Sequence, residues 1–146
     1  MGYRASIVAL GVALLGATPA AAQRVFDMRG TWTGLAEAIV DGPANHHLPP
    51  GAAGVKPAGR FRLSQQQFTV VIDGQEGRRF WGTTASSTRR ERLIGSLSFD
   101  NRTVHMVDDD GMLDGTVVDG NTLEVCYRHV KSDSAVVACT RLTRQP

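Results

Sequence analysis

The sequence lacks most of the features that mark a specialised class of protein. Its 146 residues include only two cysteines, so a dense disulfide framework is excluded, and a chain of this length can bury a core without one. Its formal net charge of +2 does not suggest the concentrated basic face that nucleic-acid binding requires. Long blocks of like charge are absent, and only 21% of the residues are charged, which argues against a disordered chain. We therefore expect one folded domain with no nucleic-acid partner.

Helical periodicity is also scarce, whereas glycine is abundant. No segment after the first 22 residues keeps a helical spacing of apolar side chains for three turns, although Ser86–Leu93 could form one short helical stretch. Sixteen glycines and six prolines indicate many tight turns, and hence many short strands. The composition therefore favours an all-β domain.

The first 22 residues form a separate segment. Arg4 precedes an apolar stretch from Ile7 to Leu15, and the segment ends in the small residues Ala20–Ala22. These three parts predict a secretory signal peptide, residues 1–22. A membrane anchor is the alternative, but the apolar run is shorter than the roughly 20 residues that a spanning helix needs. Because no cysteine near the cleavage point offers a lipid anchor, we expect residues 23–146 to be a single periplasmic or secreted domain without a membrane span.

The remaining chain predicts eight strands. Turn-forming residues separate most of them by hairpin lengths, and a long loop over Asp41–Gly59 is expected after the first. The expected strands are Gly30–Val40, Phe61–Asp73, Arg78–Thr84, Leu93–Phe99, Thr103–Val107, Leu113–Val118, Thr122–Val130 and Ala135–Thr143. Consecutive antiparallel neighbours of this number favour an eight-stranded antiparallel up-and-down β-barrel, because closure removes exposed sheet edges.

The last hairpin places the two cysteines opposite each other. A turn centred on Ser132 and Asp133 sets Cys126 against Cys139 and Glu124 against Arg141. Opposed cysteines are close enough to bridge, and an oxidising compartment favours a disulfide. A redox-active pair is the less favoured alternative, because the cysteines are not in a C-x-x-C motif.

The neighbouring hairpins define an apolar inner face. A three-residue loop over Asp119–Asn121 sets Leu113 opposite Tyr127, and alternation then puts His129 on the same face. A turn at Gln75 and Glu76 would likewise place Trp81 inside the barrel and Arg79 near one mouth. Small barrels of this strand number either fill with side chains or hold one small ligand. Trp81, Tyr127, His129 and Arg79 are therefore candidate ligand-binding residues, with a packed core as the alternative.

The two ends of the expected barrel resemble those of a known superfamily. Gly30-Thr31-Trp32 begins the first strand, Arg144 ends the last, and Phe68–Ser86 looks like the second hairpin of an avidin. This pattern resembles the calycin superfamily, which contains the lipocalins and avidins. The resemblance implies a barrel whose Trp32 closes the floor under Arg144, both residues being structural. Avidins surround their ligand with several tryptophans on later strands. Because no tryptophan follows Trp81 in this chain, the resemblance does not imply biotin binding.

Metal-binding patterns are weak. His46 and His47 are adjacent in the long loop but have no cysteine or carboxylate at ligand spacing. Asp108-Asp109-Asp110-Gly111 resembles the start of a calcium loop, but Met106 occupies the first ligand position and no glutamate closes the loop. We expect a solvated turn there, and the sequence predicts neither a metal nor a cofactor.

Catalytic patterns are weaker still, because neither a G-x-S-x-G elbow nor an H-E-x-x-H pair occurs. Ser96 is expected to oppose His105, but on a polar outer face. We therefore expect no catalytic residues, and a binding barrel for a small amphipathic ligand or a partner protein. The alternative is an interaction or inhibitor protein with a filled barrel, acting through its outer face, where Arg78, Arg79, Arg89, Arg90 and Arg92 cluster. An enzyme is the third hypothesis.

Overall fold

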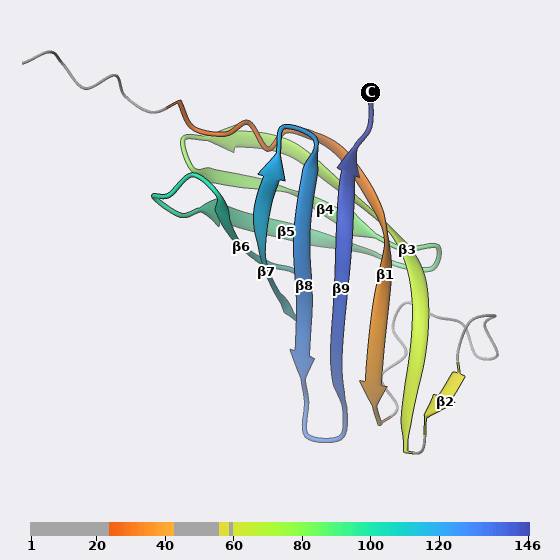
Figure 1. Cartoon of the computed structure of the whole chain (residues 1–146). Coiled ribbons are helices and arrows are strands. Elements are labelled where there is room, and N and C mark those ends of the chain that lie inside the picture. Colours follow the sequence, from red (N-terminus) through yellow and green to blue (C-terminus); the bar gives the residue numbers. More distant parts are fainter. Residues whose placement is uncertain (1–23, 43–55, 59) are drawn as a thin grey trace, which may run out of the picture.

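The chain folds into a closed antiparallel β-barrel, as the sequence predicts. A computed structural model describes residues 24–42, 56–58 and 60–146, so the expected signal peptide lies outside the described residues. The strands are β1 (Gly30–Asp41), β2 (Lys56–Ala58), β3 (Phe61–Glu76), β4 (Arg79–Ala85), β5 (Arg90–Leu97), β6 (Thr103–Val107), β7 (Met112–Asp119), β8 (Thr122–Val130) and β9 (Ala135–Arg144). Strand β1 pairs with both β9 and β3, which closes eight strands into a barrel, whereas β2 pairs only with β3 (Figure 1).

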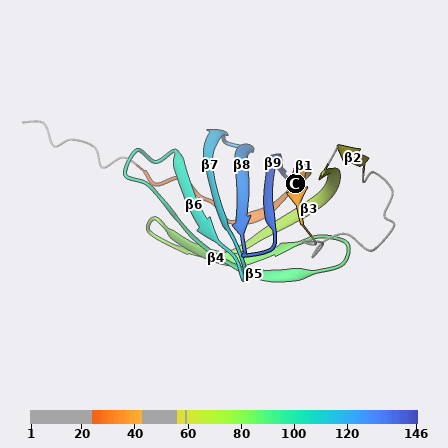
Figure 2. The same ribbon diagram turned by 90° about the horizontal axis from the view of Figure 1, so that it is seen from below.

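Seen along the barrel, β7, β8, β9 and β1 lie opposite β4 and β5 (Figure 2). Strand β6 connects these two walls on one side, and β3 connects them on the other. Within the described part of the chain, no helix has the length and apolar character needed to cross a membrane.

The predicted pairing of the last three strands is confirmed. Cys126 pairs with Cys139, and the two form a disulfide. Glu124 pairs with Arg141, whose guanidinium donates a hydrogen bond of 2.9 Å to the carboxylate on the outer face. The alternation of apolar side chains, together with the polar turns, was therefore enough to fix the register of these strands.

The turn between β3 and β4 is displaced from its predicted position. It lies at Gly77 and Arg78, not at Gln75 and Glu76. Gly77 has a φ of 59°, a left-handed conformation that glycine adopts without a steric penalty. A β-bulge between Ile72 and Gly74 changes the pairing further.

The β-bulge reverses the expected orientation of the two neighbouring aromatic residues. Phe80, not Trp81, points into the barrel, where it is 2% exposed and packs over Gly95. Trp81 is 48% exposed and lies on the outer face, against the backbone of Gly74. The prediction that Trp81 lies inside the barrel is therefore wrong. The displaced turn moves its partner from Val70 to Gly74, an even number of residues that alone would keep the face, and the bulge between Ile72 and Gly74 adds the single residue that exchanges the two faces.

Arg79 is also outside the barrel. It pairs with Glu76 rather than with Ile72, and its guanidinium lies 3.1 Å from the Glu76 carboxylate in solvent. The prediction that it lies near a mouth of the interior, opposite Ile72, is wrong for the same reason.

Two other boundaries differ from the sequence analysis. Strand β5 begins at Arg90, so most of the segment expected as a possible helix is either turn or strand. The expected loop 41–59 contains the short strand β2, because these residues pair with the start of β3. His46 and His47 lie outside the described residues.

One end of the barrel is closed by Trp32 and Arg144. Trp32 is fully buried, and its indole N–H donates a hydrogen bond of 2.9 Å to the Met28 carbonyl. The Arg144 guanidinium lies 4.1 Å from the centre of the Trp32 ring and donates a hydrogen bond of 2.6 Å to the Asp27 carbonyl. The segment preceding β1 is thereby held across this end, so any interior space must lie toward the opposite end.

Candidate ligand-binding cavity

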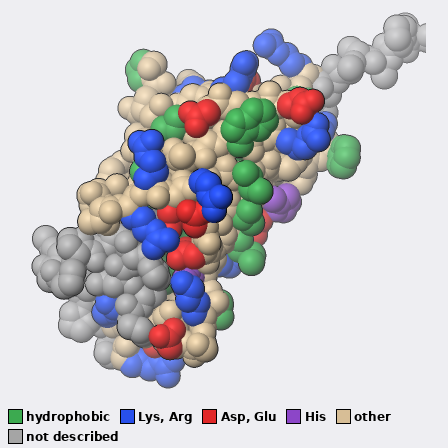
Figure 3. Space-filling model, turned by 180° about the vertical axis from the view of Figure 1, so that it is seen from behind, with side chains coloured by type: hydrophobic (Ala, Val, Ile, Leu, Met, Phe, Trp, Pro, Cys, Tyr) green, Lys and Arg blue, Asp and Glu red, His purple; other side chains and the backbone are tan. Residues whose placement is uncertain are grey.

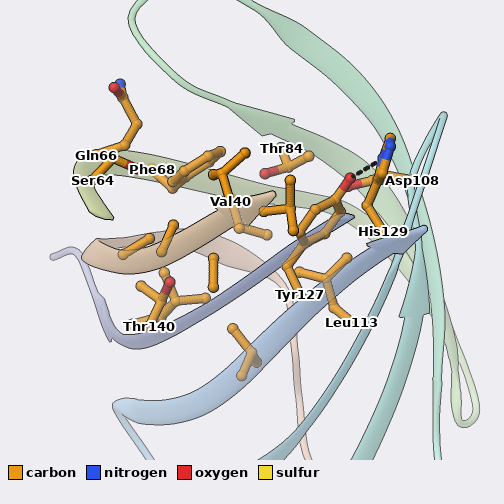
Figure 4. A pocket seen from close by; sticks show the side chains of 17 residues that line it. Val40, Ser64, Gln66, Phe68, Thr84, Asp108, Leu113, Tyr127, His129 and Thr140 are labelled. Carbon is orange, nitrogen blue, oxygen red and sulfur yellow. Dashed lines mark hydrogen bonds between the residues drawn. The ribbon is translucent and has the colours of Figure 1, made fainter. Parts of the chain in front are cut away.

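The barrel contains a cavity of about 100 Å³, which is lined on β1 by Ala36, Ala38 and Val40 but not by Trp32. Figure 4 shows the side chains that surround it. Its walls come from the inward positions of β1, β3, β8 and β9, where several side chains are small: Ala36, Ala38, Val136 and Ala138. Large residues such as Phe80 and Met28 fill the closed end instead. The interior is therefore neither fully packed nor empty, and the space that remains is set by the alanines.

The cavity has apolar walls and a polar end. Val40, Val70 and Leu142 are among its apolar lining residues. Tyr127, His129 and Asp108 lie together on one side of it (Figure 4). Such a combination can hold the apolar body of a small molecule while a few polar groups set its orientation.

The polar end is a connected hydrogen-bond network. The Tyr127 hydroxyl donates a hydrogen bond of 2.8 Å to the Asp110 carboxylate and lies 3.1 Å from Nδ1 of His129. His129 is 3% exposed. Burial, followed by the hydrogen bond to Asp110, raises the pKa of the Tyr127 phenol, so it remains a neutral donor at physiological pH.

Three carboxyl groups gather behind this network. Carboxylate oxygens of Glu91, Asp108 and Asp110 lie within 4.8 Å of one another. Glu91, on β5, has a side chain that is only 1% exposed. Desolvation, and then the charges of Asp108 and Asp110, raise the pKa of Glu91 to about 7. Desolvation likewise raises the pKa of Asp108, which lines the cavity directly.

Carboxylates at this spacing could supply oxygen ligands to a hard cation. Two cationic side chains already lie against the cluster, however. Nε of Arg89 is 2.5 Å from Glu91, and Nζ of Lys131 is 3.7 Å from Asp110. The protein's own charges therefore offset part of the negative charge, and we assign no metal to this cluster.

The structure brings together only two of the four predicted ligand-binding residues. Tyr127 and His129 line the cavity. Trp81 and Arg79 instead line a shallow groove on the outer surface, next to Ile94. The expected pairing of Ser96 with His105 is confirmed, and both lie on the outer face.

That outer face carries a Ser-His-Asp chain of hydrogen bonds. Nδ1 of His105 lies 2.7 Å from Asp114, and Nε2 lies 3.2 Å from the Ser98 hydroxyl. The side chains of His105 and Asp114 are 58% and 41% exposed, and Asp114 also pairs with Arg128. Because water is not excluded and the carboxylate is shared, we assign this chain to surface structure rather than to nucleophilic catalysis.

The sequence analysis missed Glu91, Asp108 and Asp110. The aspartates were expected in a solvated turn, but Asp108 is half-buried and the Asp110 side chain is only 12% exposed. One signal was present for Glu91, since it lies two and six residues before Leu93 and Leu97, which are both buried. Alternation therefore places Glu91 on the inner face.

Comparisons with protein-family models, with curated proteins and with solved structures find no match to this chain. The chemistry of the cavity is therefore the basis for assigning a function.

Proposed function

We propose that the protein is an exported, non-catalytic binding protein whose barrel holds a small amphipathic ligand. The observation that carries this proposal is the cavity of about 100 Å³, with alanine-rich apolar walls and Tyr127, His129 and Asp108 at one end. An apolar cavity of about 150 Å³ holds benzene, and this cavity is smaller, so a single ring or a short alkyl chain is the upper limit of ligand size.

Two further observations support the proposal. The Cys126–Cys139 disulfide suits an oxidising compartment, in agreement with export. The stacking of Arg144 on Trp32 supports a relationship to the calycin-like barrels, in which the equivalent tryptophan and arginine close the floor. The proposal assigns these two residues to structure and the opposite end of the barrel to binding.

The polar end also suggests which ligands are disfavoured. Asp108 lines the cavity, with Glu91 and Asp110 close behind it. A buried anionic headgroup would therefore meet carboxyl groups at short range, which is unfavourable in a site of low dielectric. A neutral hydroxyl could instead exchange hydrogen bonds with Tyr127 or His129. We expect phenol and benzyl alcohol to bind more tightly than benzoate.

The test measures binding of these three probes by titration calorimetry. Ala138→Phe fills the cavity from β9, whereas Val137→Phe adds the same ring at the adjacent, outward position. We expect Ala138→Phe to weaken binding of phenol at least about tenfold, and Val137→Phe to leave it unchanged. Ala38→Leu provides a second, smaller filling change should Ala138→Phe fail to fold. Equal binding by folded cavity-filled variants, or binding of none of the probes to the wild type, would overturn the proposal.

A further inference from the structure

The described side chains that line the cavity include a single acidic group. Asp108 is the one carboxylate among them, and none of them is a lysine or an arginine. The other polar lining residues are Ser64, Gln66, Thr84, Tyr127, His129 and Thr140. The charge that a ligand meets inside the barrel is therefore set chiefly by Asp108.

Glu91 and Asp110, the other two carboxylates of the acidic cluster, already have basic partners. Nε of Arg89 is 2.5 Å from the Glu91 carboxylate, and Nζ of Lys131 is 3.7 Å from the Asp110 carboxylate. Neither basic side chain lines the cavity. The outer surface is balanced in the same way, since Figure 3 shows acidic and basic side chains interspersed over one face of the molecule. Two of the three carboxylates are thus compensated from outside the cavity.

Asp108 has a different set of partners. Its Oδ1 accepts hydrogen bonds from two backbone N–H groups, at 2.8 Å from Gly111 and 3.3 Å from Asp110. Its Oδ2 accepts none from the described residues, and no described lysine or arginine side chain forms an ion pair with it. The two backbone bonds hold the carboxylate in place and favour its ionised form. Asp108 is therefore the member of the cluster whose charge a ligand is able to neutralise.

We propose that the ligand of this cavity is a small primary amine, whose protonated nitrogen pairs with Asp108 while its apolar body lies against the alanines. This inference rests on the proposed function, because it names the class of ligand for the same cavity. An alkylammonium group has three donors, and the Asp108 carboxylate and the Tyr127 phenolic oxygen offer acceptors on one side of the cavity (Figure 4).

The charge of the ligand strengthens its binding at this position. Hydrogen bonds between an ammonium group and a carboxylate are roughly twice as strong as those between neutral groups. Their attraction also grows where the protein wall displaces water, because the local dielectric constant falls. A neutral hydroxyl in the same place would leave the charge of Asp108 uncompensated.

A metal ion fits the same charge less well. Hard cations such as calcium take about six to eight oxygen ligands, whereas Arg89 and Lys131 already lie against two of the three carboxylates. An ammonium group needs only one carboxylate. It also brings an apolar chain, which makes use of the walls formed by Ala36 and Ala138.

The first test compares amines with alcohols of the same shape, by titration calorimetry at pH 8. The pairs are benzylamine with benzyl alcohol, and the smaller butylamine with butan-1-ol. At this pH Glu91, with a pKa of about 7, is ionised, and an alkyl amine is protonated, since the ordinary pKa of lysine is about 10.4. We expect each amine to bind at least about tenfold more tightly than its alcohol. Alcohols that bind as tightly as their amines would overturn this inference but not the binding function, whereas binding of no probe would overturn both.

The second test asks whether Asp108 is the source of the preference for amines. Asp108→Asn removes the charge but keeps an oxygen for the backbone hydrogen bonds. Asp109→Asn is the matched control, because Asp109 is in the same turn but pairs with Arg92, 2.9 Å away, and does not line the cavity. We expect Asp108→Asn to reduce the preference for the amine over the alcohol to within about twofold, and Asp109→Asn to keep the preference of the wild type.

A second variant covers the case in which Asp108→Asn fails to fold. Glu91→Gln removes one negative charge from behind Asp108 and leaves Asp108 itself intact, so the preference for amines should fall severalfold. A preference that stays at the wild-type value in either folded variant would overturn the proposal, as would an equal loss in Asp108→Asn and Asp109→Asn.

Discussion

Replacing Glu91 by glutamine should change how the stability of the protein depends on pH. Desolvation, followed by the charges of the nearby Asp108 and Asp110, raises the pKa of Glu91 from an ordinary value of 4.5 to about 7. Between these two pH values the folded protein holds a proton that the unfolded chain has released. The free energy of unfolding therefore falls as the pH rises through this window.

The size of the effect follows from the shift in pKa. One pKa unit corresponds to about 1.4 kcal/mol, so the rise to about 7 corresponds to roughly 3 kcal/mol of stability lost between pH 4.5 and pH 7. Glutamine carries no charge at any of these pH values, so it should remove this loss. The Glu91→Gln variant should consequently be more stable than the wild type at pH 8. Arg89 loses its partner in the variant, but its side chain is 35% exposed and water can solvate it.

The assay is urea unfolding of both proteins at intervals between pH 5 and pH 8. Glu124→Gln is the matched control, because that carboxyl group is half exposed and paired with Arg141 on the outer face. The control should keep the pH dependence of the wild type. Glu91→Gln should retain only the smaller slope that the raised pKa of Asp108 contributes. Parallel curves for Glu91→Gln and the wild type would refute the argument that this carboxyl group is buried without full compensation.

The remaining predictions concern the disulfide and the two neighbouring aromatic residues. Replacing Cys126 and Cys139 together by serine should lower the free energy of unfolding by about 3 kcal/mol, since the bridge closes a loop with a sequence separation of 13 residues; an unchanged urea midpoint would contradict this. Phe80→Ala should lower the free energy of unfolding by about 3–5 kcal/mol, because it leaves a cavity in the core. Urea unfolding of dilute protein measures this change. Trp81→Ala should lower the free energy of unfolding by less than half as much. A larger loss for Trp81→Ala than for Phe80→Ala would mean that Trp81 is the buried residue.

The C-terminal half of the barrel could be predicted from the sequence because several signals agreed. Leu113, Val125 and Leu142 alternate with polar residues, and short polar turns separate their strands. Only one register then puts all the apolar side chains on one face. Cys126 and Cys139 fall opposite each other in that register, which is why the disulfide was predictable as well.

The β3–β4 hairpin could not be predicted in the same way. Gly74 and Gly77 both permit a turn, and the segment between them contains no apolar residue that would decide between them. Phe80 and Trp81 are adjacent, so hydrophobicity alone does not tell which of them is buried. The β-bulge before Gly74, a backbone feature with no clear sequence signal, decides the outcome.

The acidic end of the cavity could not be predicted from the sequence for a different reason. Consecutive aspartates followed by glycine are typical of solvated turns, and the burial of Asp108 and Asp110 arises only when β8 brings Tyr127 alongside them. Glu91 lies between two arginines, which suggests an exposed polar strand. Glu91 points inward because it lies two residues before the buried Leu93 on the same strand. The carboxyl groups that it meets there, on Asp108 and Asp110, come from a turn that begins 17 residues later in the chain.

The β-bulge in β3 determines side-chain positions both inside the barrel and on its outer surface. By turning Phe80 inward, it supplies a large side chain that packs over Gly95 near the closed end, while the alanines of β1 and β9 leave space at the other end. By turning Trp81 outward, it places the indole on the outer face, beside the exposed Ile94 of β5. Without the bulge, the same turn would place the indole in the interior, on the face of Val70 and Ile72. One irregularity in the backbone therefore accounts both for where the barrel is filled and for the exposure of Trp81 on its outer face.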